Sequence, residues 1–443
     1  MERQLMSQLV HWQSNPQRKP LLLRGPRQVG KTWLLKRFGA QRFKNVVYVN
    51  FDEAQELAAL LETSKNIPRI VEHLSLATGA PIQAGTTLLI FDEIQECNAA
   101  LNTLKYFCED APELHVAAAG SLLGVALSRP GSFPVGKVDF LDLHPLTFSE
   151  FLLANGDASL LQYLESISTF EPIPAIFFTQ LTEKLGRYLV VGGMPEPVSQ
   201  WTERKDLAAT TTAQQAILDA YRLDVAKHAP NSDIPKIGYL WDSVPSQLSR
   251  ENRKFIYRAA RESARAREYE AALHWLVDTR TVTRVNRCTR PELPVSAYDD
   301  LSAFKLYMSD TGLLARHALF DYSVLTDPMA PFTQFKGALS ENYVLQSLVA
   351  QFDGRPRYWT SGGEAEVDFV VQRRNDIHPI EVKAGVNVKA KSLAVYRANY
   401  SPRIAVRLSL RNLQFRDGLL DVPLFMADQL DRLIGLAAES PPT

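Results

Sequence analysis

The chain has 443 residues, more than one hydrophobic core usually fills, so two or three domains are expected. Its 46% hydrophobic and 22% charged residues are typical of a globular protein, and 49 basic residues balance 49 acidic ones. This balance argues against nucleic-acid binding through bulk positive charge but leaves a local basic patch open. Three cysteines without metal-ligand spacing fit a reducing compartment. No stretch approaches the roughly 18 apolar residues of a membrane span, so we expect a cytoplasmic protein without a membrane partner.

Short apolar runs recur through the first third of the sequence, each bounded by turn residues, and helical stretches separate most of them. This alternation predicts an α/β fold in which a parallel sheet has crossover helices, with both faces of the sheet covered. The expected strands are Pro20–Arg24, Asn45–Asn50, Thr87–Phe91, His115–Ala119 and Val138–Leu143.

The stretch Gly25–Thr32 fits the pattern G-x-x-x-x-G-K-[ST] at every position and lies between an apolar run and a helix. Glycines permit a turn that points several backbone N–H groups at one anion, and the helix N-terminus adds partial positive charge. A loop that merely turns a corner would need neither the lysine nor the threonine. We therefore expect a P-loop NTPase, with Lys31 on the β- and γ-phosphates and the Thr32 hydroxyl on Mg²⁺. The residues expected at the nucleotide are Gly25, Pro26, Gln28, Val29, Gly30, Lys31, Thr32 and Trp33.

An acidic pair supplies the second half of the predicted phosphate site. The apolar run Leu88–Phe91 ends in Asp92 and Glu93, with one predicted strand between this run and the P-loop. Alone, such a run is an ordinary strand end, but here Asp92 is expected to hold the Mg²⁺ shell and Glu93 to polarise the attacking water. Ser121, after the strand at 115–119, is expected either as a catalytic sensor between water and γ-phosphate or as a helix cap.

From about Leu146 to Leu248 the sequence shows helical periodicity without strand-like runs, which predicts an α-helical lid or linker domain. Within the lid, Val191–Pro195 is a turn-forming break between helices.

The segment from Arg250 to Arg290 is basic, with 11 Lys and Arg against 5 Asp and Glu. A helix over 251–277 followed by a strand at Thr281–Asn286 is interpreted as a winged-helix-like module. Helical spacing would place three arginines on one face, which either grips phosphates or pairs with glutamates of the same helix. These arginines are Arg258, Arg261 and Arg265.

The last third returns to mixed α and β structure, with a helix at 336–352 followed by three strands. Glu381 and Lys383 are two apart on one strand and share a face, Asp368 lies across a predicted hairpin, and Glu341 projects from the helix. Such carboxylates can bind Mg²⁺ or Mn²⁺ to activate water at a scissile phosphate, with Lys383 placing the water. This set is the arrangement of PD-(D/E)XK nucleases; the alternative is a domain of this fold kept for binding. The expected strands are Arg357–Thr360, Val367–Gln372 and His378–Lys383.

Over nearly its whole length the sequence resembles prokaryotic AAA-type ATP-binding proteins that have a C-terminal domain of unknown function. The resemblance implies ATP as the nucleotide and a proline of the lid near adenine, here Pro195. One departure is Gly136–Lys137, where relatives commonly have Gly-Arg, so no arginine finger is assigned. The resemblance rests on Gly25–Thr32, Leu88–Gln95, Ala119–Leu122, Pro145–Phe151, Gly192–Pro195, Arg250–Phe255, Lys305–Gly312, Glu341, Glu366–Asp368 and Ile380–Lys383.

The resemblance also implies four parts of the chain. These are a P-loop ATPase core over 1–145, a helical lid over 146–235, a winged-helix-like segment over 236–330, and a PD-(D/E)XK nuclease-like domain resembling restriction endonucleases over 331–443.

Two functions of different class follow from these features. The first is a Mg-ATP hydrolase that drives a DNA-directed, nuclease-like C-terminal module. The second is a slow, nucleotide-gated scaffold that binds a protein partner through an inactive C-terminal domain. A metabolic kinase shares the P-loop but leaves the additional domains unexplained. The oligomeric state stays open.

Overall fold

The computed structural model describes residues 1–124, 135–250, 253–320, 334–363, 365–385 and 391–440. Two positions of the motif Arg250–Phe255, Glu251 and Asn252, therefore lie outside the described residues. The chain divides into two compact units. One contains residues 2–144 with Asp278–Arg280, and the other contains Met1, 145–277 and 281–443.

The N-terminal unit is a five-stranded parallel sheet in the order β2-β3-β4-β1-β5. All five predicted strands are present, and the α/β class with a parallel P-loop sheet is confirmed. The elements of this unit are α1 (Leu5–Ser14), β1 (Leu21–Arg24), α2 (Lys31–Arg42), β2 (Asn45–Asn50), α3 (Gln55–Thr63), α4 (Ile67–Thr78), β3 (Thr87–Asp92), α5 (Asn98–Asp110), β4 (His115–Ala119) and β5 (Asp139–Asp142).

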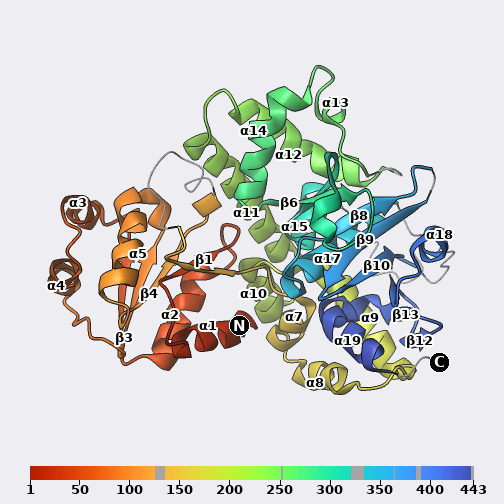
Figure 1. Ribbon diagram of the computed structural model, residues 1–443, viewed down its shortest axis with the longest axis horizontal. Helices are drawn as coiled ribbons and strands as arrows, with labels where there is room; N and C mark the ends of the chain where they lie inside the picture. Colours follow the sequence, from red (N-terminus) through yellow and green to blue (C-terminus); the bar gives the residue numbers. More distant parts are fainter. Residues whose placement is uncertain (125–134, 251–252, 321–333, 364, 386–390, 441–443) are drawn as a thin grey trace. The chain divides into compact units, whose positions relative to one another are not determined.

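Helices cover both faces of this sheet (Figure 1). On one face, Leu34 and Phe38 of α2 pack with Leu9 of α1 against the strands. On the other face, α3, α4 and α5 contribute a second apolar cluster that includes Ile70 and Leu104. Every residue of β3 is buried, which explains why its sequence is continuously apolar instead of alternating.

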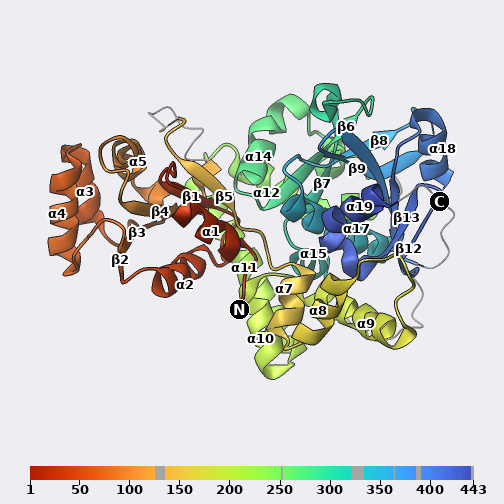
Figure 2. The same ribbon diagram turned by 60° about the horizontal axis from the view of Figure 1, so that its bottom comes forward.

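The second unit begins with helices and continues into an eight-stranded mixed sheet, so its α/β character is also confirmed (Figure 2). The helices before the sheet are α7 (Phe148–Ala154), α8 (Ala158–Ser166), α9 (Ala175–Val191), α10 (Pro195–Arg204), α11 (Leu207–His228), α12 (Ile234–Leu248), α13 (Tyr257–Ala260) and α14 (Ala266–Asp278).

The sheet of this unit has the strand order β12-β13-β11-β10-β9-β8-β6-β7. The strand predicted at Thr281–Asn286 is β6, which forms a hairpin with β7. This hairpin is part of the same sheet as the C-terminal strands, because β6 pairs in parallel with β8. The remaining elements are β6 (Val282–Cys288), β7 (Asp299–Met308), α15 (Thr311–His317), α17 (Gln334–Gln351), β8 (Arg357–Thr360), β9 (Glu366–Arg373), β10 (Asp376–Val382), α18 (Lys391–Tyr400), β11 (Ala405–Ser409), β12 (Gln414–Arg416), β13 (Leu419–Pro423) and α19 (Leu430–Glu439).

The prediction of one long basic helix over 251–277 is wrong. The chain forms the one-turn helix α13 and then α14, and Arg261 at the end of α13 has extended backbone angles. Tyr257 packs against Phe255 and Phe304, and Ala264 between the two helices is buried, so tertiary packing overrides helix propensity here. Arg258, Arg261 and Arg265 consequently do not share one helix face.

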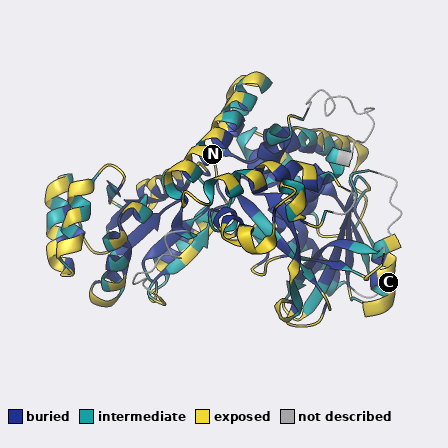
Figure 3. Cartoon of the chain, turned by 90° about the horizontal axis from the view of Figure 1, so that it is seen from above, coloured by how far each residue is buried: buried dark blue, intermediate teal, exposed yellow. Residues whose placement is uncertain are grey.

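Figure 3 shows that buried residues are concentrated in the strands, whereas the outer helix faces are exposed. None of the helices in the described part of the chain is long and apolar enough to cross a membrane. The subdivision of the second unit into lid, winged-helix-like segment and nuclease-like domain stays a prediction.

Candidate functional site

The P-loop lies between β1 and α2, as predicted. A side chain at Gly25 would place its Cβ 2.3 Å from the Leu143 carbonyl oxygen, so only glycine fits beside β5. Gly30 has a left-handed backbone with φ of 95° and precedes the first residue of α2. Gln28 is also left-handed, with φ of 63°. This local geometry turns the loop into the N-terminus of α2, where backbone N–H groups favour a phosphate.

Lys31 is the first residue of α2 and is only 7% exposed. Its Nζ donates to the carbonyl oxygens of Gly25 at 3.0 Å and Pro26 at 2.8 Å. Burial lowers the pKa of Lys31 to about 8, even though the carboxylates of Glu93 and Asp92 oppose this shift. The amine therefore lies against the loop that is predicted to hold the phosphates.

Thr32 and Asp92 form the corner predicted to hold Mg²⁺. The Thr32 hydroxyl donates to Asp92 Oδ2 at 2.7 Å, and the Tyr48 hydroxyl donates to the same oxygen at 2.9 Å. A hydroxyl and a buried carboxylate on neighbouring elements are the oxygen ligands that Mg²⁺ prefers, so these residues fit the ion. Tyr48 was missed in the sequence, where it stands out from the other residues of β2 only as an aromatic with a polar end.

Glu93 follows β3 in a left-handed conformation with φ of 46°. Its carboxylate accepts a hydrogen bond from Gln95 Nε2 at 2.6 Å, while its backbone N–H donates to Asp92 Oδ1 at 3.1 Å. Ser121 lies just beyond β4, the strand next to β3, and its buried hydroxyl has no hydrogen-bond partner among the described residues. Ser121 thus makes no cap hydrogen bond to the described residues, and an unsatisfied buried hydroxyl in such a place calls for an explanation.

The other residues expected at the nucleotide differ in exposure. Val29 is completely buried, whereas the Trp33 ring is 43% exposed beside Arg37. Pro195 is the first residue of α10 and belongs to the second unit, so its contact with adenine stays a prediction.

The Gly192–Pro195 turn packs against a buried aspartate. Gly192 ends α9 with φ of 75°, and Asp310 Oδ2 accepts the Gly193 N–H at 2.6 Å. A Cβ at Gly192 would lie 2.2 Å from Asp310 Oδ1, which requires glycine there. Burial raises the pKa of Asp310 to about 6.

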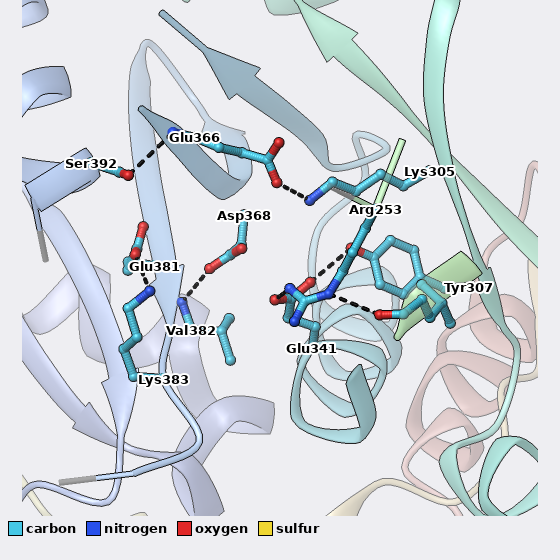
Figure 4. A network of polar contacts seen from close by, with 11 residues as sticks. Arg253, Lys305, Tyr307, Glu341, Glu366, Asp368, Glu381, Val382, Lys383 and Ser392 are labelled. Carbon is cyan, nitrogen blue, oxygen red and sulfur yellow. Dashed lines mark hydrogen bonds and ion pairs between the residues drawn. The ribbon is translucent and has the colours of Figure 1, made fainter. Parts of the chain in front are cut away.

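Three of the four predicted nuclease-site residues come together at the ends of β9 and β10 (Figure 4). Asp368 Oδ2 accepts the backbone N–H of Val382 at 2.8 Å, and Lys383 Nζ lies 2.5 Å from Glu381 Oε1. Burial, followed by the nearby Asp368 charge, raises the pKa of Glu381 to about 7 despite Lys383. Glu381 Oε2 is buried and lacks a hydrogen-bond partner among the described residues.

Glu341 on α17 has different partners. Arg253 forms an ion pair with it, and the Tyr307 hydroxyl donates to its Oε2 at 3.1 Å (Figure 4). Within the described ranges, no group of three His, Cys, Asp or Glu side chains is placed to hold a metal ion.

Sequence reasoning also missed a buried lysine beside this set. Lys305 on β7 is 0% exposed, and its Nζ lies 2.5 Å from Glu366 Oε1. Burial opposes its charge, but Tyr307 and the carboxylates of Glu366 and Asp368 outweigh burial and raise the pKa of Lys305. The alternation Lys305-Leu-Tyr307 on a strand was the available signal, because both side chains share one face.

Comparison with protein families agrees with the P-loop geometry of the first site. Residues 17–152 match a family described as AAA domain. The chain carries an AAA-type P-loop ATPase domain. After this AAA domain, residues 182–323 match a domain of unknown function (DUF8612), and residues 336–425 match a domain of unknown function (DUF4143).

No curated protein matches the sequence significantly. Solved structures with similarity include a Walker-type ATPase of Pyrococcus abyssi, at 13% identity and a TM-score of 0.45 over 71% of this chain and 95% of that one. The RuvB Holliday junction branch migration motor of Thermotoga maritima is 16% identical, with a TM-score of 0.24 over 60% of this chain and 82% of that one. A signal-transduction ATPase of Pyrococcus horikoshii with a tetratricopeptide repeat sensor is 12% identical, with a TM-score of 0.26 over 80% of this chain and 46% of that one.

Proposed function

We propose that this protein hydrolyses Mg-ATP in its AAA domain and couples hydrolysis to a DNA-directed, nuclease-like C-terminal module. The observation that carries the first half is the Thr32–Asp92 contact of 2.7 Å beside the buried amine of Lys31. One cation and two oxygen ligands, held by β3 and α2 at the end of a parallel sheet, are the parts that nucleotide hydrolysis needs.

Each residue of the AAA domain has one role in this proposal. Lys31 binds the β- and γ-phosphates, and Thr32 with Asp92 would hold Mg²⁺, which when bound supplies charge stabilisation at the phosphates. Glu93 orients the attacking water. The unsatisfied hydroxyl of Ser121 is available to hydrogen-bond that water or the γ-phosphate.

The nuclease-like half of the proposal rests on Asp368, Glu381 and Lys383. Asp368 and the unpartnered Glu381 Oε2 would hold a Mg²⁺ or Mn²⁺ ion, which supplies an activated water when bound. Because a metal ion favours the ionised form of a carboxylate, a pKa of about 7 makes Glu381 easy to convert to a ligand near neutral pH. Lys383 is close enough to Glu381 to place the water.

A second function, the nucleotide-gated scaffold, is favoured by one observation. Glu341 is bound to Arg253 and Tyr307 instead of facing a metal with the other carboxylates. If this contact persists with DNA present, the C-terminal domain would bind a protein partner without cutting DNA.

Phosphate release with Mg²⁺, measured with and without duplex DNA, tests the first half. Lys31→Ala and Glu93→Gln should both lose hydrolysis, and Glu93→Gln should retain ATP binding because Lys31 is intact. Stimulation by DNA supports the coupling. Negligible hydrolysis by the wild-type protein with and without DNA favours the scaffold.

Cleavage of duplex and single-stranded DNA with Mg²⁺ or Mn²⁺ tests the second half. Glu381→Ala should abolish cleavage while leaving phosphate release in the AAA domain unchanged. Glu262→Ala, at an exposed position, is the matched control. If the wild-type protein neither shifts a DNA band nor cuts DNA, the nucleic-acid half is wrong.

A further inference from the structure

Asp278–Arg280, which are the last residue of α14 and the next two residues before β6, belong to the N-terminal unit although they are distant from it in sequence. The approach of this segment is close. A Cβ at Gly124 would lie 2.3 Å from the Asp278 carbonyl oxygen, so the neighbouring backbone accepts the segment only because residue 124 is glycine. These three residues therefore pack closely against the unit's own backbone at Gly124.

Arg280 reaches the edge of the sheet where the P-loop begins. Its Nη2 lies 3.0 Å from Asp142 Oδ1, at the end of β5. Asp142 is paired in register with Arg24, the last residue of β1, and the next residue along the chain is Gly25. The Arg280 guanidinium thus contacts the strand directly beside the start of the phosphate-binding loop.

Asp142 is held by two arginines in unequal ways. Arg24 makes two hydrogen bonds, from Nε to Oδ1 at 2.8 Å and from Nη2 to Oδ2 at 3.0 Å. Arg280 contacts one of these same oxygens. If Arg280 moved away, Asp142 would keep a bidentate partner, so the move would leave no uncompensated carboxylate.

Arg280 is close enough to the phosphate-binding lysine for their charges to interact. Both Arg280 and Arg27 contribute to the lowered pKa of Lys31, after the larger effects of burial and the acidic pair. Positive charge gathered around a P-loop favours a polyanion such as ATP over the empty loop. The Arg280 side chain is also 30% exposed, which leaves its guanidinium accessible to a ligand.

The backbone of Arg280 has an unusual conformation that indicates a constrained position. Arg280 has φ of 59°, a left-handed conformation that is costly for a residue with a side chain. A specified backbone conformation of this kind is common where a side chain is positioned for a function.

We propose that Arg280 is an ATP-sensing arginine supplied within the same chain: its guanidinium leaves Asp142 and binds the terminal phosphate when ATP is present. There it stabilises the negative charge that hydrolysis redistributes over the phosphate oxygens. ADP lacks the terminal phosphate and leaves Arg280 on Asp142. This inference rests on the ATP hydrolysis proposed above for the catalytic role, but its prediction for nucleotide preference is independent of hydrolysis.

The experiment uses the full chain and compares Arg280→Ala and Arg280→Lys with the wild-type protein. Affinities for ADP and for the slowly hydrolysed analogue ATPγS are measured by calorimetry, and kcat by phosphate release. In Arg280→Ala we expect kcat to fall about 100-fold or more, ADP affinity to stay within about twofold, and the preference for ATPγS over ADP to fall about tenfold. Arg280→Lys should restore only part of kcat, since an ammonium cannot make the bidentate contact.

Arg222→Ala is the matched control, because Arg222 forms an exposed ion pair with Asp242 in the second unit. The proposal is overturned if folded Arg280→Ala keeps kcat within about threefold and the same nucleotide preference as the wild type. If Arg280→Ala does not fold, Arg280→Lys decides by the same criteria. If the wild type does not hydrolyse ATP, the proposed hydrolysis fails, and the nucleotide preference alone supports or overturns the role of Arg280.

Discussion

Thr32 and Asp92, which come from α2 and β3, lie 2.7 Å apart between the hydroxyl and the carboxylate Oδ2. Their contact joins the helix that follows the P-loop to the strand that ends in the acidic pair. Tyr48, on the neighbouring strand β2, donates to the same Oδ2 at 2.9 Å. One oxygen thus receives two hydrogen bonds, which fixes the Asp92 carboxylate in the orientation needed beside a metal ion.

Tyr48→Phe should weaken the response to Mg²⁺. The variant removes one hydrogen bond to a charged acceptor and leaves the ring, so we expect about tenfold more Mg²⁺ to be needed for half-maximal phosphate release. Tyr298→Phe is the control, since Tyr298 donates to the carboxylate of Glu292 at the same distance of 2.9 Å on an exposed surface. Equal Mg²⁺ titrations for Tyr48→Phe and wild type would show that the Tyr48 hydroxyl does not orient Asp92 for the metal ion.

Lys31 should take up a proton when ATP binds. Its pKa is about 8 in the protein alone, so about half of the lysines are neutral at pH 8. Phosphates favour the charged amine and raise its pKa again, so ATP binding draws protons from the buffer between about pH 7 and 9, and affinity falls as pH rises through this window. Calorimetry at pH 8 in buffers of different ionisation enthalpy measures the uptake. Lys31→Arg, which stays charged, should show none; buffer-independent heats for the wild type would contradict the prediction.

The arrangement of the P-loop and the acidic pair could be predicted largely from the sequence because its parts are local. Gly25–Thr32 follows a strand and begins a helix, and Asp92 ends a fully buried strand, so chain order alone places them at one edge of the sheet. Tyr48 and Arg280 could not be found in this way. Each has an ordinary sequence neighbourhood. Tyr48 meets Asp92 because β2 lies beside β3 in the sheet, and Arg280 meets Asp142 through the segment between α14 and β6.

At the C-terminal site too, local features could be predicted from the sequence, whereas contacts with distant residues could not. Hairpin spacing correctly placed Asp368 beside the Glu381 strand, because β9 and β10 pair across a two-residue turn. The partners of Glu341 were not predictable, since Arg253 and Tyr307 are distant in sequence. The prediction of one continuous basic helix was wrong for a related reason: Ala264, between α13 and α14, is buried by packing that helical periodicity does not reveal.

Asp310→Ala should destabilise the second unit. Asp310 is completely buried and accepts N–H groups from Gly193 and from Leu313 at 2.9 Å, which would be left without partners. Removing the buried charge offsets part of this loss, so we expect the free energy of unfolding to fall by roughly 2–4 kcal/mol. Urea unfolding followed by tryptophan fluorescence measures it. Asp219→Ala, on an exposed face of α11, should change stability by less than about 0.5 kcal/mol. Equal midpoints for the two variants would rule out the role assigned to Asp310.

Glu381→Gln should change how stability depends on pH. The pKa of Glu381 rises from its ordinary value of 4.5 to about 7 in the folded protein, chiefly through burial and also through Asp368. Between these values the folded state keeps a proton that the unfolded state has lost. The stability linked to this group is therefore fully present below about pH 4.5 and is lost as pH rises toward 7.

Glutamine has nearly the same shape and carries no charge, so Glu381→Gln should be more stable than the wild type at pH 8, by roughly 1–3 kcal/mol, and the difference should shrink toward pH 5. Urea unfolding at pH 5, 6, 7 and 8 measures this dependence, with Glu262→Gln at an exposed position as control. A difference that is constant across these pH values would mean that Glu381 is already ionised at pH 5. In that case its carboxylate would need no proton release to bind a metal ion, and metal affinity would not increase with pH between 6 and 8.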